Sequence, residues 1–387
     1  MTDEVKALHD QRTNDLHLTL DFKEPERVPI CTEVLYWPLA YANVKIADIQ
    51  GKPEKHRDAF CKVFDDMYTD AIGGGGVSVC LDLINTLGSK SYFVSGDEIT
   101  VQHSDGCIMD ASEYDNYIAD PVGYPVNTLA PRRLEKLAQS DEEVKALLKQ
   151  ACEQIISYQE GNRLCRERLE GEKGIVYFQG GGFYAPVDYI FDYIRGFRNT
   201  ILDMRRNPEK LLKACEAYMN TVDFDAYTKM ASRGYPPILQ TPVHSLPFLS
   251  RTQFEKFWVP YYKPFIEAVK KGGGKIKMRG EGQCEYCLDF FADSEKGFYT
   301  WQFDRDDPYK MYEKYGDKFV FQCGIDNVEL GGLTKEKCLD IAKKAVDTFA
   351  PGGGFIFSTQ KIILCANEVK AENIIAVHQF VHEYGKY

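Results

Sequence analysis

The sequence predicts an α/β fold in which strand–helix units close into a single (β/α)8 TIM barrel. Apolar, β-branched runs alternate with longer amphipathic stretches, and the connections between them are short. About eight such units fit between residue 27 and the C-terminus. Strict alternation with short connections implies parallel strands joined by right-handed crossovers, and about eight units favour a closed barrel over an open sheet.

The first half of the chain departs most from this regular pattern. An N-terminal extension, about residues 1–25, is expected to be helical. Residues 27–38 are predicted to form a strand and an aromatic loop, and residues 73–88 a glycine run leading into another strand. Apolar and polar residues alternate over 91–112, with turn signals at SGDE and SDG, which predicts a small antiparallel β-ribbon inserted early in the fold. Helical periodicity and then a β-branched run predict a helix over 141–172 and a strand over 174–182.

The second half is regular. Asn207 and Asp307, each followed by proline, are natural helix N-caps. The predicted strands are 236–244, 275–282, 299–307, 319–326 and 354–359, and the predicted helices are 207–234, 250–274, 284–297, 308–318, 334–354 and 370–385. No Gly/Pro/Ser-rich linker divides the chain, so residues 1–387 are expected to form one domain.

Composition narrows the classes of function. The chain has 387 residues and a formal net charge of −11, which argues against nucleic-acid binding. No apolar run reaches the roughly 18 residues that a membrane helix needs, and the polar N-terminus does not resemble a secretory signal. The 12 cysteines are dispersed, so we expect reduced thiols in a cytoplasmic protein.

The barrel prediction selects candidates for chemistry, because active sites of such barrels lie in the loops after the strands. The residues at these positions are Glu33, Tyr36, Trp37, Asn85, Gln179, Phe183, Tyr184, His244, Glu281, Asp304, Asp306, Asp307, Cys323, Asp326, Ser358, Thr359 and Gln360.

Glu281 and His244 are the most informative of these. Glu281 lies between two glycines at a strand end, where a ligand can approach the backbone; capping the next helix is its alternative role. His244 ends the preceding strand, where a structural hydrogen bond is the alternative. With the thiol of Cys323 they make a candidate three-ligand zinc site with an open position. The C-x-x-C pair at Cys284 and Cys287 lacks a second ligand pair and is interpreted as the opening turn of a helix.

Other strand-end residues are assigned supporting roles. Asp304 directly follows its strand and could orient a ligand or act as a base. Gly180–Gly182 leaves room for a ligand beside apolar walls. The substrate-binding candidates are Tyr36, Trp37, Gln179, Phe183 and Tyr184.

Four segments of the chain carry a resemblance to a known family. They are PVHSLPFLSRTQFEKFWVPYYKPFIEAV, MRGEGQCEYCLDFFADSEKGFYTWQFDRDDP, FVFQCGIDNVELGGLTKEKC and GGGFIFSTQKIILCANEVKAENIIAVHQFVHEYG. From PERVPI at residues 25–30 to the C-terminus, the chain resembles the uroporphyrinogen decarboxylase superfamily, which includes corrinoid-dependent methyltransferases. The resemblance implies a (β/α)8 barrel and, in many members, a homodimer.

Departures from the superfamily patterns narrow the expectation. True decarboxylases carry an early R-x-A-G-R-type loop and a histidine after the last strand, and CTEVLYWPLAYANV and STQKIIL contain neither. Thiol-methylating members bind zinc through H-x-C on the strand equivalent to KIKMRG and through a later cysteine. Lys277, Arg279 and about Lys361 stand at those places here. The P-V-H and E-G strand ends resemble a subgroup associated with corrinoid-dependent methyltransferases that demethylate small substrates, including aryl methyl ethers in anaerobes.

The resemblance therefore implies methyl transfer from a small O-methylated, aromatic substrate to the cobalt of cobalamin on a partner corrinoid protein. Zinc bound by His244, Glu281 and Cys323 would polarise the substrate oxygen, with Asp304 in support. The chain shows no D-x-H-x-x-G element, so the cobalamin is expected on a separate protein. The alternatives are a decarboxylase or lyase of a small carboxylic acid, and a non-catalytic barrel subunit of a methyltransferase complex.

Overall fold

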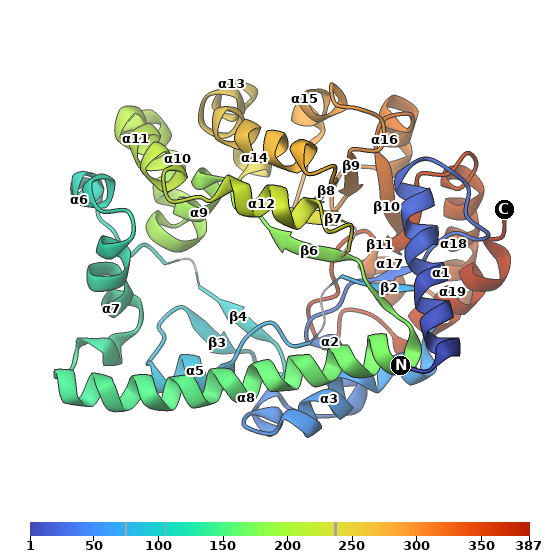
Figure 1. Ribbon diagram of the computed structural model, residues 1–387, viewed down its shortest axis with the longest axis horizontal. Helices are drawn as coiled ribbons and strands as arrows, with labels where there is room; N and C mark the ends of the chain where they lie inside the picture. Colours follow the sequence, from blue (N-terminus) through green and yellow to red (C-terminus); the bar gives the residue numbers. More distant parts are fainter. Residues whose placement is uncertain (74–75, 105, 236–237) are drawn as a thin grey trace.

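The computed structural model describes residues 1–73, 76–104, 106–235 and 238–387 and has the predicted barrel architecture (Figure 1). The parallel strands are β1 (Cys31–Thr32), β2 (Ala71–Ile72), β5 (Val176–Tyr177), β6 (Gln179–Gly182), β7 (Ile238–Val243), β8 (Ile276–Gly280), β9 (Tyr299–Gln302), β10 (Val320–Ile325) and β11 (Phe355–Thr359). They pair in parallel in two sheets, in the orders β1-β2-β5 and β11-β10-β9-β8-β7-β6.

The two sheets join into a ring. β5 and β6 are separated by Phe178 alone and connect the sheets on one side. On the other side, the parallel bridges Ile30–Phe357 and Val34–Ile363 link the chain around β1 to that around β11. With β5 and β6 taken as one position, the described residues supply the eight strand positions of a (β/α)8 barrel, and the predicted fold class is confirmed.

Helices surround the strands, and the long helix α8 runs along one edge of the molecule (Figure 1). The α-helices are α1 (Asp3–Leu20), α2 (Trp37–Ala42), α3 (Pro53–Cys61), α4 (Val63–Asp66), α5 (Leu81–Thr86), α6 (Tyr114–Ala119), α7 (Ala130–Arg133), α8 (Asp141–Lys173), α9 (Pro186–Ile190), α10 (Phe197–Arg206), α11 (Pro208–Met219), α12 (Phe224–Ala231), α13 (Arg251–Gln253), α14 (Val259–Lys271), α15 (Leu288–Ala292), α16 (Pro308–Tyr315), α17 (Asn327–Gly332), α18 (Lys335–Phe349) and α19 (Ala371–Tyr384). The short 3-10 or π segments are η1 (Ile46–Ile49), η2 (Ala111–Glu113), η3 (Pro125–Leu129), η4 (Glu135–Ala138), η5 (Phe191–Arg195), η6 (Leu246–Phe248), η7 (Phe254–Trp258) and η8 (Glu285–Cys287).

The barrel interior has an apolar layer near the N-terminal ends of the strands. Alternate strand residues fill it because side chains of a strand point to opposite faces in turn. Leu16 and Leu20 of α1 pack against this layer and close that end of the barrel. The strand residues of the layer are Cys31, Ala71, Val176, Phe178, Ile238, Val320 and Ile356.

Of the two elements predicted over residues 73–88 and 91–112, the described part of the chain contains the ribbon but not the strand. The ribbon is confirmed as the antiparallel pair β3 (Tyr92–Val94) and β4 (Val101–His103). The strand expected within 73–88 is wrong: β2 precedes the glycines, and Leu81–Thr86 forms helix α5. Only the two residues of β2 enter the buried ladder, where Ala71 and Ile72 pair with both β1 and β5. Residues 74–75 of the glycine run and 236–237 of an expected strand lie outside the described residues.

Within the described ranges, no helix combines the length and the apolar character that crossing a membrane requires.

Candidate active site at the barrel mouth

Sheet register brings His244 and Glu281 together. Val243 at the end of β7 pairs with Gly280 at the end of β8, so the residues that follow them emerge side by side at the barrel mouth. His244 Nε2 lies 3.1 Å from Glu281 Oε1. His244 Nδ1 lies 2.5 Å from Oδ2 of Asp192, which η5 supplies. The imidazole is thus held between two carboxylates.

The two carboxylates set the charge of the imidazole. Burial alone would lower the pKa of His244, but the hydrogen bonds to Asp192 and Glu281 outweigh it and raise that pKa to about 11. Burial would likewise raise the pKa of Glu281, yet the hydrogen bond from His244 holds it below its usual value. At neutral pH the arrangement is therefore an imidazolium between carboxylates, with both ring nitrogens carrying protons.

Tyrosines pack beside this imidazolium. Tyr184 contacts His244 edge-on, with ring centroids 5.9 Å apart, and its hydroxyl lies 3.5 Å from that of Tyr193. Burial and the neighbouring Tyr193 raise the pKa of Tyr184, so its phenol stays neutral. The site therefore combines charged groups with flat apolar surface.

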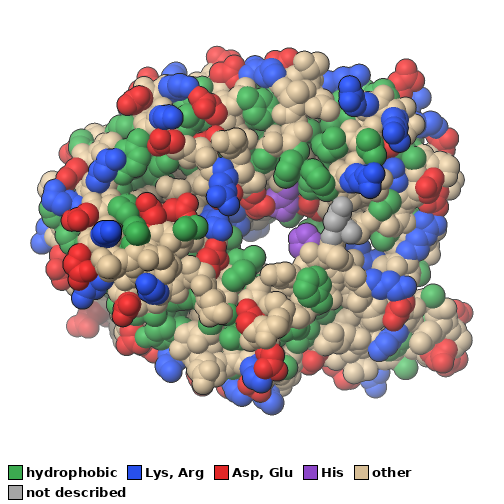
Figure 2. Space-filling model, turned by 180° about the vertical axis from the view of Figure 1, so that it is seen from behind, with side chains coloured by type: hydrophobic (Ala, Val, Ile, Leu, Met, Phe, Trp, Pro, Cys, Tyr) green, Lys and Arg blue, Asp and Glu red, His purple; other side chains and the backbone are tan. Residues whose placement is uncertain are grey.

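These side chains border a cavity of about 300 Å³. That volume is at the lower end of the range for small-molecule sites. Figure 2 shows a hollowed face of the molecule with histidine side chains at the edge of its opening. The cavity is lined by Gln179, Gly180, Gly182, Tyr184, Gln240, Pro242, His244, Arg279 and Glu281.

Below the mouth, a fully buried carboxylate organises the polar part of the barrel interior. Glu33 pairs with Lys277, receives a 2.7 Å hydrogen bond from Arg279 Nη2, and receives another of 3.0 Å from Gln322 Nε2. Lys277 and Arg279 face inward because they occupy alternate positions of β8. Gly73 after β2 leaves the necessary space, since a Cβ there would lie 2.6 Å from Glu33 Oε1. The buried carboxylate of Glu33 is tolerated because the Arg279 guanidinium and the Gln322 amide donate to it and Lys277 contacts it, although burial lowers the pKa of Lys277 well below its usual value.

Of the predicted substrate-binding residues, Gln179 and Tyr184 line the cavity. Tyr36, Trp37 and Phe183 are each at most 2% exposed and belong to the main apolar core. Phe183 stacks on Phe265 with centroids 4.7 Å apart. The structure therefore does not place these three at the cavity.

Of the other predicted catalytic and metal residues, Cys323 lies apart from His244 and Glu281, whereas Asp304 is near enough to Glu281 for the two carboxylates to repel each other. Cys323 is wholly buried and shares the outward face of β10 with Phe321, which packs on Tyr312 of α16, whereas Gln322 points inward to Glu33. Asp304 is half-buried, near Arg305 and Lys361, and is absent from the cavity lining. Burial raises the pKa of Asp304.

This arrangement does not match the zinc set expected from the sequence. Both nitrogens of His244 are engaged by carboxylates, and the Cys323 thiol faces the helix layer. No group of three or more His, Cys, Asp or Glu side chains in the described part of the chain is arranged to hold a metal ion. A three-ligand zinc site needs such a group, so these residues as placed do not fit it.

Sequence reasoning missed Asp192 as well as the inward roles of Gln240 and Arg279. Asp192 belongs to an amphipathic segment remote in sequence from both strand ends, and no motif marks it. Gln240 and Arg279 follow from strand alternation, which could have identified them had the inward face been known. The predicted helix cap at Asp307 is confirmed, since its side chain accepts from Tyr309 N.

Comparisons with known proteins agree with the fold. A methyltransferase from Methanosarcina mazei is structurally similar with a TM-score of 0.63, although only 13% of residues are identical; the match covers 96% of this chain and 98% of that one. No curated protein matches the sequence. The family model described as uroporphyrinogen decarboxylase (URO-D) matches residues 121–384, well over half of the chain. With its closed parallel barrel and this match, the chain belongs to the uroporphyrinogen decarboxylase (URO-D) family.

Proposed function

We propose that this protein transfers a methyl group from a small O-methylated, aromatic substrate to the cobalt of a separate corrinoid protein. The observation that carries the proposal is the imidazolium of His244, clamped by Asp192 and Glu281 on the wall of a cavity with Tyr184 beside it. The structural similarity to a methyltransferase at 13% identity supports the fold that such a reaction uses.

Breaking an oxygen–methyl bond requires activation of the leaving oxygen. A phenoxide has a conjugate acid of pKa about 10, so it leaves poorly without a proton or a Lewis acid. The corrinoid supplies a nucleophilic metal centre that accepts the methyl group. As the carbon–oxygen electron pair moves to oxygen, His244 Nε2 donates its proton there and the imidazole becomes neutral.

The surrounding residues keep this donor in place. Asp192 holds Nδ1, which fixes the ring and stabilises its charge. Glu281, whose side chain is 43% exposed, occupies Nε2 in the free protein and can yield that position to the substrate oxygen. The raised pKa keeps the imidazole protonated in the free protein, so a proton is available at Nε2 when the substrate oxygen replaces Glu281. Tyr184 offers a flat face to the substrate ring.

The test follows methylation of the corrinoid by its absorbance spectrum, with candidate corrinoid proteins and methoxylated aromatic compounds. His244→Gln and Asp192→Asn are expected to lower the rate, the first by about 10²-fold or more, because general acid catalysis contributes 10²–10⁴-fold. His17→Gln, on remote helix α1, is the matched control and should keep the wild-type rate. Full activity in a folded His244→Gln protein would reject this role.

Zinc remains a prediction from the sequence, and proton donation by His244 does not require it. Elemental analysis of the purified protein tests it directly. Stoichiometric zinc that is lost in both His244→Ala and Glu281→Ala would replace the proton donor by a Lewis acid. A homodimer is likewise proposed from the family resemblance, with light scattering as its measurement.

A decarboxylase or lyase acting on a small acid is the second candidate, because the guanidinium of Arg279 lies on the wall of the cavity. Release of CO2 from an aromatic acid, without methylation of the corrinoid, would favour it. Binding of substrate with neither reaction would favour a non-catalytic subunit.

A further inference from the structure

We propose that a side cavity beside the barrel mouth binds a medium-chain alkyl carboxylate, whose acid group is held by Arg133. None of the residues that line this side cavity lines the cavity bordered by His244 and Glu281. The proposal therefore concerns a second ligand, and it does not depend on methyl transfer.

The side cavity has a volume of about 240 Å³ and lies between η3, α7 and η5. Figure 1 shows α6 and α7 on the side of the molecule away from the chain termini. Pro125 and Ala130 are only half-buried, so solvent reaches the lining of the side cavity. Its walls are two tyrosine rings and the aliphatic side chains of Ile108, Pro125, Leu129, Ala130, Leu134 and Ile194.

The volume of the side cavity limits the size of the ligand. An apolar cavity of about 150 Å³ in another protein holds benzene, so the larger volume here admits a chain of about eight carbons. Each methylene group that leaves water for an apolar wall strengthens binding by about fourfold. A flexible alkyl chain therefore suits these mainly aliphatic walls.

Arg133, the last residue of α7, lies at the boundary of the side cavity. It also lines a smaller pocket of about 80 Å³ that reaches His244. Arg133 Nη2 donates to the Tyr193 carbonyl oxygen at 2.7 Å, and the guanidinium carbon lies 5.8 Å from the centroid of the Tyr193 ring. The backbone of Arg133 is held as well, because Lys90 N donates to its carbonyl oxygen at 3.0 Å.

The guanidinium of Arg133 lacks a counter-ion. Its Nε is buried without a hydrogen-bond partner, and no carboxylate forms an ion pair with it among the residues that the structure describes. Asp192 also lines the smaller pocket, but its carboxylate contacts His244 Nδ1. The preceding residue, Arg132, is by contrast paired with Glu113 through both of its Nη atoms. Because a guanidinium stays protonated and a part-buried charge is costly when unpaired, an anion that enters here is stabilised.

An alkyl carboxylate satisfies both features of the side cavity. Its two oxygens can accept parallel hydrogen bonds from the guanidinium, while its chain covers the aliphatic walls. A neutral ligand would leave the charge of Arg133 unpaired. A small inorganic anion would leave the apolar walls in contact with water.

The experiment compares octanoate with its neutral amide, octanamide, by calorimetry on the purified full chain. The wild-type protein is expected to bind octanoate at least about tenfold more tightly, because charge-assisted hydrogen bonds are roughly twice as strong as neutral ones. Arg133→Gln should remove this preference. Butanoate, which is four methylene groups shorter, should bind at least about tenfold more weakly than octanoate.

Four further variants locate the site. Ala130→Trp fills the side cavity and should weaken octanoate binding at least about tenfold, since the chain loses its apolar contacts. Arg133→Lys keeps the charge without the paired donors, so an intermediate preference is expected. Arg198→Gln, which removes an exposed cation of α10, and Arg279→Gln, which removes the cation of the other cavity, should both keep the wild-type affinity for octanoate.

Circular dichroism verifies that each variant folds, and Arg133→Lys with Ala130→Trp carries the test if Arg133→Gln does not. The site is overturned by equal affinity for octanoate and octanamide, by no binding of octanoate at millimolar concentration, or by unchanged affinity in folded Arg133 and Ala130 variants. Loss of octanoate binding in Arg279→Gln would also overturn it, because the acid would then bind at the barrel mouth. No methyl donor or corrinoid takes part in these measurements, so their outcome is independent of the function proposed above.

Discussion

At the scale of single residues, His244 shows how neighbours override burial. An isolated buried imidazole loses its proton because water no longer stabilises the charge. Here Asp192 and Glu281 contact both nitrogens and reverse the direction of the pKa shift. The same strand-end position without them would hold a neutral ring suited to metal binding.

The protonation state of His244 is directly measurable. Nitrogen NMR of the imidazole should show both nitrogens protonated from pH 6 to about pH 9, since the folded pKa is raised to about 11. Asp192→Asn and Glu281→Gln should each lower that pKa. The contacts of protonated His244 with the two carboxylates stabilise the folded state. This contribution is fully present below the unfolded pKa of about 6.5 and is lost as pH rises toward 11. A neutral ring at pH 8 in the wild type would contradict this geometry.

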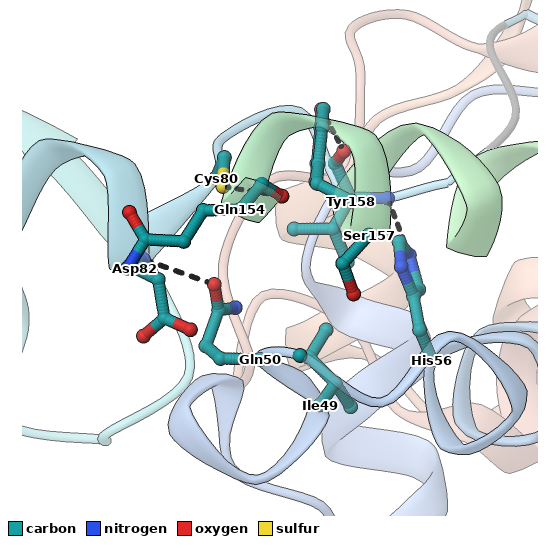
Figure 3. Close-up of a pocket in the computed structure, with 10 residues that line it drawn as sticks. Ile49, Gln50, His56, Cys80, Asp82, Gln154, Ser157 and Tyr158 are labelled. Atoms are coloured by element: carbon teal, nitrogen blue, oxygen red, sulfur yellow. Dashed lines mark hydrogen bonds between the residues drawn. The ribbon is translucent and has the colours of Figure 1, made fainter. Parts of the chain in front are cut away.

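At the scale of elements, helices α3 and α8 meet at a glycine. A Cβ on Gly161 of α8 would lie 2.3 Å from His56 Nδ1. His56 accepts a hydrogen bond from Val77 N at 3.3 Å and lines a cavity of about 10 Å³ (Figure 3). Because such a cavity has room for about one water molecule, the imidazole has little space to move aside.

Gly161→Ala is therefore expected to destabilise the protein by about 1–3 kcal/mol through overpacking, despite the better helix propensity of alanine. Gly171→Ala is the matched control in the same helix, because a Cβ there meets nothing within 4 Å. It should stabilise by about 0.5–1 kcal/mol. Denaturant midpoints measure both, and equal effects of the two substitutions would contradict the close contact.

At the scale of the whole molecule, buried neutral histidines couple stability to acid. Burial lowers the pKa of both His56 and His378 to about 4. His378 Nδ1 lies 2.8 Å from the Tyr68 carbonyl oxygen, which joins α19 to the chain before β2. Both imidazoles are therefore neutral at pH 7, and each contacts the backbone of a segment that is distant in the sequence.

A depressed histidine pKa makes the folded state lose stability on acidification. The contribution is present above the unfolded pKa of about 6.5 and is lost as pH falls toward 4, by about 2 kcal/mol per histidine between pH 7 and 5. His378→Gln, which keeps a donor for Tyr68, should reduce the loss measured by urea denaturation at the two pH values. If the variant and the wild type lose the same free energy of unfolding between pH 7 and pH 5, the prediction is wrong.

The sequence by itself determined the barrel and one pair of its site residues. The local spacing of apolar residues predicts each strand and helix, and this spacing does not depend on contacts between distant parts of the chain. His244 and Glu281 follow from it too, because the ends of successive parallel strands meet at one mouth.

Only the tertiary structure decided which side chains share that mouth. Inward or outward direction placed Cys323 and Phe183 in the core and Arg279 in the cavity, since a shift of one residue along a strand reverses its face. Asp192 reached His244 from a separate segment through packing that no local pattern encodes. The charge of the site depends on these approaches, because electrostatic interactions are set by distance and burial rather than by order in the chain.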